Sequence, residues 1–220
     1  MKPIIGYYGI WVTLTYLSVT SAVVGMFLAL RGNIGAAIIC LMICGLCDMF
    51  DGTVARLRDR TTDQESYGIQ VDALADIVSF GAFPIVIGYA IGAYEILANS
   101  PSLGLGLSIA ASALYILAAL IRLAYFNVIE IKLYNKDEKR THYVGMPVTM
   151  VALLIPLVYA ICLIFNIELH MIYNVMLAII SVAFLIRVKI PKIKSRYLLF
   201  FLLIGLPIAV YLIWNIGART

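Results

Sequence analysis

The stretch "CDMFDGTVARLRDRTTDQESYGIQVDALADIVSFGAFP", residues 47–84, places Asp48, Asp51, Asp72 and Asp76 inside or beside long apolar segments. An ionised carboxylate within a membrane-spanning helix costs about 2.5 to 3.5 kcal/mol on insertion scales. Repulsion between neighbouring carboxylates adds to that cost, so a positive charge is expected between them. The stretch therefore predicts a membrane setting and a cation-binding chemistry within it.

The composition supports the membrane setting. Of the 220 residues, 63% are hydrophobic and 13% are charged, which excludes an ordinary soluble globular domain. A helix needs about 20 apolar residues to cross a hydrocarbon layer of about 30 Å. Apolar runs occupy residues 10–30, 34–47, 69–93, 103–128, 144–165, 171–188 and 197–214. The expected fold is an all-α, polytopic transmembrane bundle of six to seven spans, forming one membrane-embedded domain over residues 1–220.

The distribution of positive charge predicts the orientation of this bundle. The first apolar run is too long for a signal-peptide core and lacks a small-residue cleavage site, so we expect it to remain as an anchor. With the N-terminus in the cytoplasm, most lysines and arginines fall on the cytoplasmic side, and only Arg31 and Arg219 fall outside. The sequence thus predicts an integral protein of the cell membrane with its aspartates facing the cytoplasm. The net charge of +4 needs no nucleic-acid partner.

The aspartates are spaced to meet in one place. Thr62 and Glu65 form a T-x-x-E pattern that predicts a capping box and a third helix starting near Asp63. The two aspartates that follow are four residues apart, and the two on the preceding helix are three apart, so each pair shares one helix face. Two antiparallel helices are therefore expected to present two carboxylates each to a shared space.

Four carboxylates without a cysteine or histidine set favour Mg²⁺ or Mn²⁺, and they are enough to hold two ions. Paired divalent ions are a recurrent device for displacement at phosphorus. Gly52 and Ala55 lack bulk where a pyrophosphate would approach, and Arg56 supplies a permanent cation for phosphate. The alternative is a structural salt-bridge network between aspartates and arginines.

The spacing D-x-x-D-G-x-x-A-R at residues 48–56, followed by G-x-x-x-D-x-x-x-D at residues 68–76, resembles the signature of the CDP-alcohol phosphotransferases. The resemblance implies a membrane enzyme with a cytoplasm-facing two-metal site. Such an enzyme moves a phosphatidyl-type group from a CDP-linked donor to an alcohol and releases CMP. The family pattern usually has eight residues between arginine and glycine, where this chain has eleven, but added length in a charged loop costs little.

The resemblance also implies roles for individual residues. The residues that would bind two Mg²⁺ or Mn²⁺ ions are Asp48, Asp51, Asp72 and Asp76. Gly52, Ala55 and Arg56 would hold the diphosphate of the CDP donor, and Asp76 would also act as the general base. Members of the family suggest that the chain forms a homodimer.

The acceptor alcohol depends on residues outside this signature. The segments "IVSFGAFP" (residues 77–84), "RLAYFNV" (122–128) and "GMP" (145–147) are similar to integral-membrane phosphatidylserine synthases. This implies transfer from CDP-diacylglycerol or CDP-archaeol to L-serine. We expect the planar fork of Arg122 to hold the serine carboxylate and Asn127 to orient the amino group. The alternative is that Arg122 only neutralises aspartate charge or binds a lipid phosphate.

Two alternatives remain open. Within the same class, the substrates would include inositol phosphate, glycerol phosphate or an archaeal ether lipid. In a different class, the aspartates would form the ion site of a cation transporter. A transporter would be expected to place its site near mid-bilayer at broken helices, with repeat symmetry between its halves. Here the carboxylates lie towards one face, and no second half of the sequence mirrors them.

Overall fold

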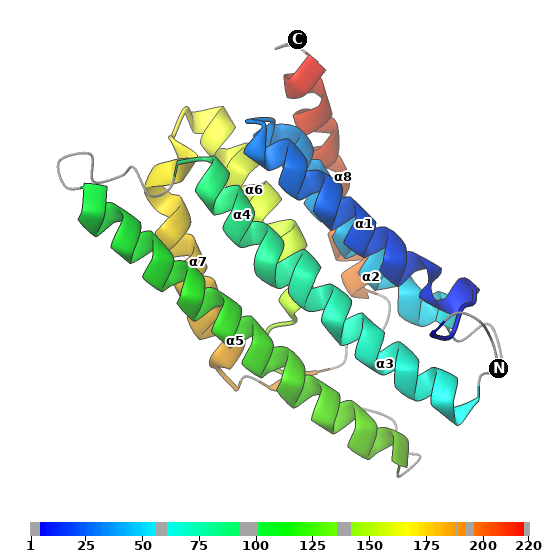
Figure 1. Ribbon diagram of the computed structural model, residues 1–220. Helices are drawn as coiled ribbons and strands as arrows, with labels where there is room; N and C mark the ends of the chain where they lie inside the picture. The colour runs from blue at the N-terminus through cyan, green and yellow to red at the C-terminus, as the bar shows by residue number, and fades with distance from the viewer. Residues whose placement is uncertain are drawn as a thin grey trace.

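The computed structural model describes residues 5–55, 61–92, 101–135, 142–187, 189–191 and 196–217. Its α-helices are α1 (Ile10–Leu30), α2 (Ile34–Ala55), α3 (Thr62–Asp76), α4 (Phe83–Ala90), α5 (Pro101–Asn135), α6 (Val151–Phe165), α7 (Leu169–Leu185) and α8 (Arg196–Gly217). In Figure 1, α3 and α4 continue in line as one rod that lies between α1 and α5. The predicted all-α bundle is confirmed.

Among the residues that the structure describes, five helical stretches are long and apolar enough to cross a membrane. They are Ile10–Leu30, Ile34–Gly52, Thr62–Ala90, Gly104–Ile129 and Val148–Phe165. Two shorter apolar helices, Ile172–Leu185 and Gly205–Trp214, coincide with the last two expected segments. Large apolar side chains such as Phe27, Leu117 and Ile179 are exposed on the outer faces, where lipid would cover them. The chain is therefore an integral membrane protein.

Close packing of α1 against α2 and α4 builds the first side of the bundle. Gly25 on α1 allows this approach, because a Cβ there would lie 2.2 Å from the ring of Phe83 and 2.8 Å from Cys40. Ser21 on α1 donates a hydrogen bond to the carbonyl of Cys40 at 3.1 Å. Since Phe83 is fully buried, any larger residue at position 25 would push α4 away from the α1–α2 pair.

The third helix starts one residue earlier than the capping prediction. Thr61 is the N-cap: its hydroxyl accepts from the N–H of Gln64 at 3.3 Å, and the Gln64 side chain accepts from the N–H of Thr61 at 3.1 Å. The predicted box of Thr62 and Glu65 is therefore wrong. Two adjacent threonines offered two registers, and glutamine serves as well as glutamate at the third helical position.

A short antiparallel ladder was not predicted. Strand β1 (His142–Val144) pairs with β2 (Lys189–Pro191), and Tyr143 lies opposite Ile190. Sequence periodicity could not reveal strands of three residues. The ladder joins the segment before α6 to the segment after α7. After β1, the chain enters a 3₁₀ turn, η3 (Val148–Met150), which leads into α6.

Candidate active site

A cavity of about 370 Å³ lies among α1, α2, α3, α5 and η3. One wall is acidic and carries all four predicted aspartates: Asp48, Asp51, Asp72 and Asp76. The other walls carry Arg122 and Asn127 from α5, Trp11 and Thr15 from α1, and Thr149 from η3. The cavity thus places an acidic surface and a permanently charged guanidinium around one shared space.

Three of the aspartates form a tight cluster. One carboxylate oxygen from each of Asp48, Asp72 and Asp76 lies within 4.8 Å of the others. Asp72 and Asp76 are brought together by their spacing of one helical turn on α3, and Asp48 reaches them from α2. Asp51 lines the same cavity but lies outside this cluster.

The cluster fits a small divalent cation. Carboxylate oxygens are the hard ligands that Mg²⁺ and Mn²⁺ prefer. Oxygens bound to one Mg²⁺ at 2.0–2.1 Å lie at most about 4.2 Å apart. A group whose oxygens already lie within 4.8 Å therefore needs only a small adjustment to share one ion.

The residues expected at the diphosphate are only partly described. Gly52 lines the cavity, and a Cβ at this position would have nothing within 4 Å, so it faces open space. Gly68 lines the cavity one turn before Asp72. Arg56 and the side chain of Ala55 lie outside the described residues.

Arg122 is 6% exposed and is held by main-chain carbonyls. Its Nε donates to the carbonyl oxygen of Met146 at 3.1 Å, and its Nη2 donates to that of Gly145 at 3.2 Å. Its guanidinium also lies 5.8 Å from the centroid of the Phe126 ring. The Nε and Nη2 groups of Arg122 therefore hold the segment that leads into η3. The sequence did not predict this structural role.

Gly145 is constrained from two sides. Its φ is +78°, and a Cβ would lie 2.8 Å from the carbonyl oxygen of Ile186 and 3.5 Å from the Arg122 guanidinium. Glycine is the residue that adopts this conformation without steric cost. The "GMP" segment is therefore a close contact between α5 and the end of α7, and it places Pro147, Val148 and Thr149 at the cavity wall.

Asn127 also lines the cavity, although it lies five residues after Arg122 and about 140° around an ideal helix. The structure thus brings both expected acceptor residues to the same space. Trp11, Thr15 and Thr149 were missed by sequence reasoning. They come from segments far from the signature, and Thr149 is marked only by its position just after "GMP".

Comparisons with known proteins agree with this geometry. The sequence profile of the CDP-alcohol phosphatidyltransferase family matches residues 12–187. The chain is 33% identical over 127 residues to the CDP-diacylglycerol–serine O-phosphatidyltransferase of Saccharomyces cerevisiae, covering 54% of this chain and 40% of the yeast protein. It is 27% identical over 158 residues to the archaetidylserine synthase of Methanothermobacter thermautotrophicus, covering 72% and 60%. The enzyme of Bacillus subtilis with the same name as the yeast protein is 27% identical over 162 residues, covering 74% and 75%.

Proposed function

Because the chain belongs to the CDP-alcohol phosphatidyltransferase family, we propose that it transfers a phosphatidyl group from CDP-diacylglycerol to L-serine. The products are phosphatidylserine and CMP. The observation that carries the proposal is the cluster of Asp48, Asp72 and Asp76 in a cavity that Arg122 also lines. The names of the relatives support serine as the acceptor.

The metal centre would use the aspartates as ligands for Mg²⁺ or Mn²⁺. Asp48, Asp72 and Asp76 form the cluster that one ion would share, and Asp51 would contribute to a second ion. Bound divalent ions would neutralise the donor diphosphate and stabilise the charge that develops during displacement at phosphorus. They would also supply the positive charge that carboxylates in a membrane-spanning helix require.

The donor would bind on the α2 side of the cavity. Gly52 leaves open space there, which would admit the diphosphate close to the helix backbone. Ala55 would keep the following turn free of bulk, and Arg56 would pair with a phosphate. The fatty chains would extend into the surrounding lipid, because the outer faces of the helices are apolar.

The acceptor would bind on the α5 and η3 side. Asp76 would accept the proton of the serine hydroxyl as its oxygen forms a bond to the phosphatidyl phosphorus and CMP departs. Arg122 would attract the serine carboxylate by its charge, and Asn127 would receive the amino group. Two of the five N–H donors of Arg122 bind the carbonyls of Met146 and Gly145, which fixes the position of the guanidinium in the cavity wall.

The side of the membrane, the oligomeric state and the type of donor lipid are part of the same proposal. The site would face the cytoplasm, and the chain would act as a homodimer. One relative is named archaetidylserine synthase, so a donor with ether-linked chains, such as CDP-archaeol, is the second candidate. The chain spans 40% and 60% of the length of the first two relatives described above.

A direct assay tests the proposal. Purified protein is incubated with Mg²⁺ or Mn²⁺ and with one lipid donor, CDP-diacylglycerol or CDP-archaeol. Each reaction also contains one acceptor: serine, glycerol phosphate or inositol phosphate. Lipid products are identified by mass, and Asp76→Asn protein is the matched control. We expect the wild-type protein to form phosphatidylserine and the Asp76→Asn protein to form none. If a lipid product forms only with another alcohol, that alcohol is the acceptor in place of serine. Metal-ion flux in proteoliposomes without any lipid product would favour a transporter.

A further inference from the structure

The helix widens immediately after Asp76. Residues Ile77–Ala82 form a π-helical segment, η1, and the N–H of Phe83 donates to the carbonyl of Val78, five residues earlier. A wide turn holds one more residue than a regular α-helical turn, and each residue corresponds to about 100° of rotation. The direction in which the α3 aspartates point relative to α4 therefore depends on this turn.

Two tyrosines from other helices bind the carbonyls around this turn. Pro84 has no N–H and cannot donate to the carbonyl of Phe80, four residues earlier. The hydroxyl of Tyr115 on α5 donates to that carbonyl instead. The hydroxyl of Tyr173 on α7 donates to the carbonyl of Pro84 at 2.8 Å. Both tyrosines are 0% exposed, so water does not compete for these bonds.

Neighbouring side chains enclose the same turn. The hydroxyl of Ser79 lies 3.1 Å from that of Ser18 on α1, and both serines are buried. A Cβ at Gly81 would lie 2.9 Å from Ile116 on α5, so that helix approaches the turn closely. The wide turn is thus contacted from α1 and α5, and α7 contacts the start of α4 just beyond it. In Figure 1 this region is the junction where α3 passes into α4.

We propose that Tyr115 and Tyr173 are positioning residues for the metal centre: by holding the wide turn and the start of α4, they set the rotation of α3 that brings Asp72 and Asp76 to Asp48. Neither tyrosine is among the described residues that line the cavity. They act on the main chain beyond the last aspartate and touch no substrate. The proposal rests on the proposed metal function and adds the device that assembles it.

Direct metal binding tests the proposal without turnover. Mn²⁺ is titrated into detergent-purified protein, and free Mn²⁺ is followed by electron paramagnetic resonance. Tyr115→Phe and Tyr173→Phe are expected to bind Mn²⁺ about 10- to 100-fold more weakly, as when a supporting partner of a metal ligand is removed. Tyr211→Phe is the matched control, because Tyr211 on α8 packs against the core away from this turn, and it should bind Mn²⁺ as the wild type does.

A double variant separates positioning from general stability. In Tyr115→Phe/Pro84→Ala, residue 84 regains an N–H that can donate to the Phe80 carbonyl in a regular helix. We expect Tyr115→Phe alone to lower the thermal midpoint and the double variant to restore it. The Mn²⁺ affinity should stay low, because a regular helix would rotate Asp72 and Asp76 away from Asp48.

The outcomes distinguish this proposal from the one on which it rests. Wild-type Mn²⁺ affinity in both single variants, or recovery of affinity together with the thermal midpoint in the double variant, would overturn the positioning role alone. A wild-type protein that binds no Mn²⁺ would overturn the metal centre itself and this role with it. Should Tyr115→Phe fail to fold, Tyr173→Phe and the double variant give the same comparison.

Discussion

Carboxylate oxygens of Asp48 on α2 and Asp76 on α3 lie within 4.8 Å of one another, with Asp72 as the third member of the group. Asp48 lies in the membrane-spanning stretch Ile34–Gly52, and Asp76 lies in the middle of the stretch Thr62–Ala90, which α3 opens. Charged carboxylates this close repel each other strongly where water is scarce. A bound cation removes that repulsion, and the first prediction follows from this requirement.

Removal of divalent metal should abolish phosphatidyl transfer. Excess chelator is expected to stop product formation, and added Mg²⁺ or Mn²⁺ should restore it. Ca²⁺ should support the reaction poorly, because its bonds are longer and its geometry looser. Product is measured by mass, with a chelator already saturated with metal as the control. Full turnover in excess chelator would rule out the metal mechanism.

Replacement of Asp76 by asparagine should lower kcat by about 10²-fold or more, the usual worth of general acid–base catalysis. Part of the donor binding should survive, because Asp48 and Asp72 remain. Asp48→Asn is the comparison variant, in which loss of donor binding should dominate. Binding of CDP-diacylglycerol is measured separately from turnover. If Asp76→Asn loses donor binding as completely as Asp48→Asn, Asp76 is a ligand and not the base.

Arg122→Lys should raise the KM for serine severalfold and leave the KM for CDP-diacylglycerol near its original value. A lysine ammonium cannot reach both the Met146 and Gly145 carbonyls in the geometry of a guanidinium. The wall beside Thr149 would then shift. Gly145→Ala should change the serine KM in the same direction, because its Cβ would lie 2.8 Å from the Ile186 carbonyl.

Steady-state kinetics of the Arg122→Lys protein, with each substrate varied in turn, test the role of Arg122. An unchanged serine KM with impaired donor binding would assign Arg122 to the lipid phosphate. Equal losses for both substrates, together with a lower thermal midpoint, would indicate a purely structural role.

Gly52→Ala should weaken donor binding without loss of stability. The added methyl group meets no protein atom within 4 Å but enters the cavity where the diphosphate is proposed to lie. Gly106→Ala is the matched control, since a Cβ there also meets nothing within 4 Å and Gly106 lies on α5 away from the cavity. The KM for CDP-diacylglycerol should rise only for Gly52→Ala. A rise in both variants would point to a general helix effect.

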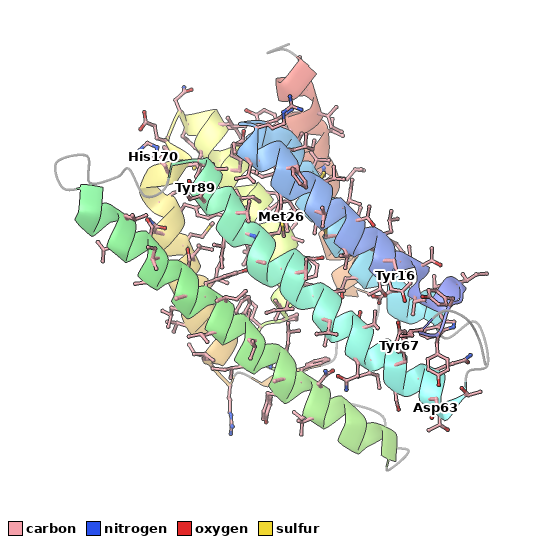
Figure 2. All side chains as sticks on the ribbon, in the orientation of Figure 1. Tyr16, Met26, Asp63, Tyr67, Tyr89 and His170 are labelled. Carbon is pink, nitrogen blue, oxygen red and sulfur yellow. The ribbon has the colours of Figure 1, made fainter. Side chains whose placement is uncertain are left out.

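Cysteine labelling should reveal which side of the membrane the site faces. Asp63 lies in the first turn of α3, and Glu168 lies at the start of α7. Figure 2 shows Asp63 and His170, two residues after Glu168, at opposite ends of the bundle. An impermeant maleimide applied to intact cells should label Glu168→Cys, and should label Asp63→Cys only after permeabilisation. The wild type, with its four free cysteines, gives the background. The reverse pattern would place the site outside.

The sequence by itself determined the membrane-spanning helices and the aspartate faces. Hydropathy and helical spacing are local properties, so the apolar runs and the pair Asp72 and Asp76 could be read directly. The eleven-residue connection after Arg56 did not prevent the two halves of the signature from lining one cavity. The start of α3 at Thr62 was missed by one residue, since neighbouring capping registers differ little in energy.

Only the tertiary structure decided which groups meet across the bundle. The cluster includes Asp48 but not Asp51, because it depends on how α2 sits against α3. The carbonyl partners of Arg122 come from a segment more than twenty residues further along the chain. The hydroxyls of Tyr115 and Tyr173 bind carbonyls in the wide turn and just beyond it, and no local pattern relates these tyrosines to the Pro84 region. Contacts between distant segments form only when the helices pack, so their geometry follows from the whole fold.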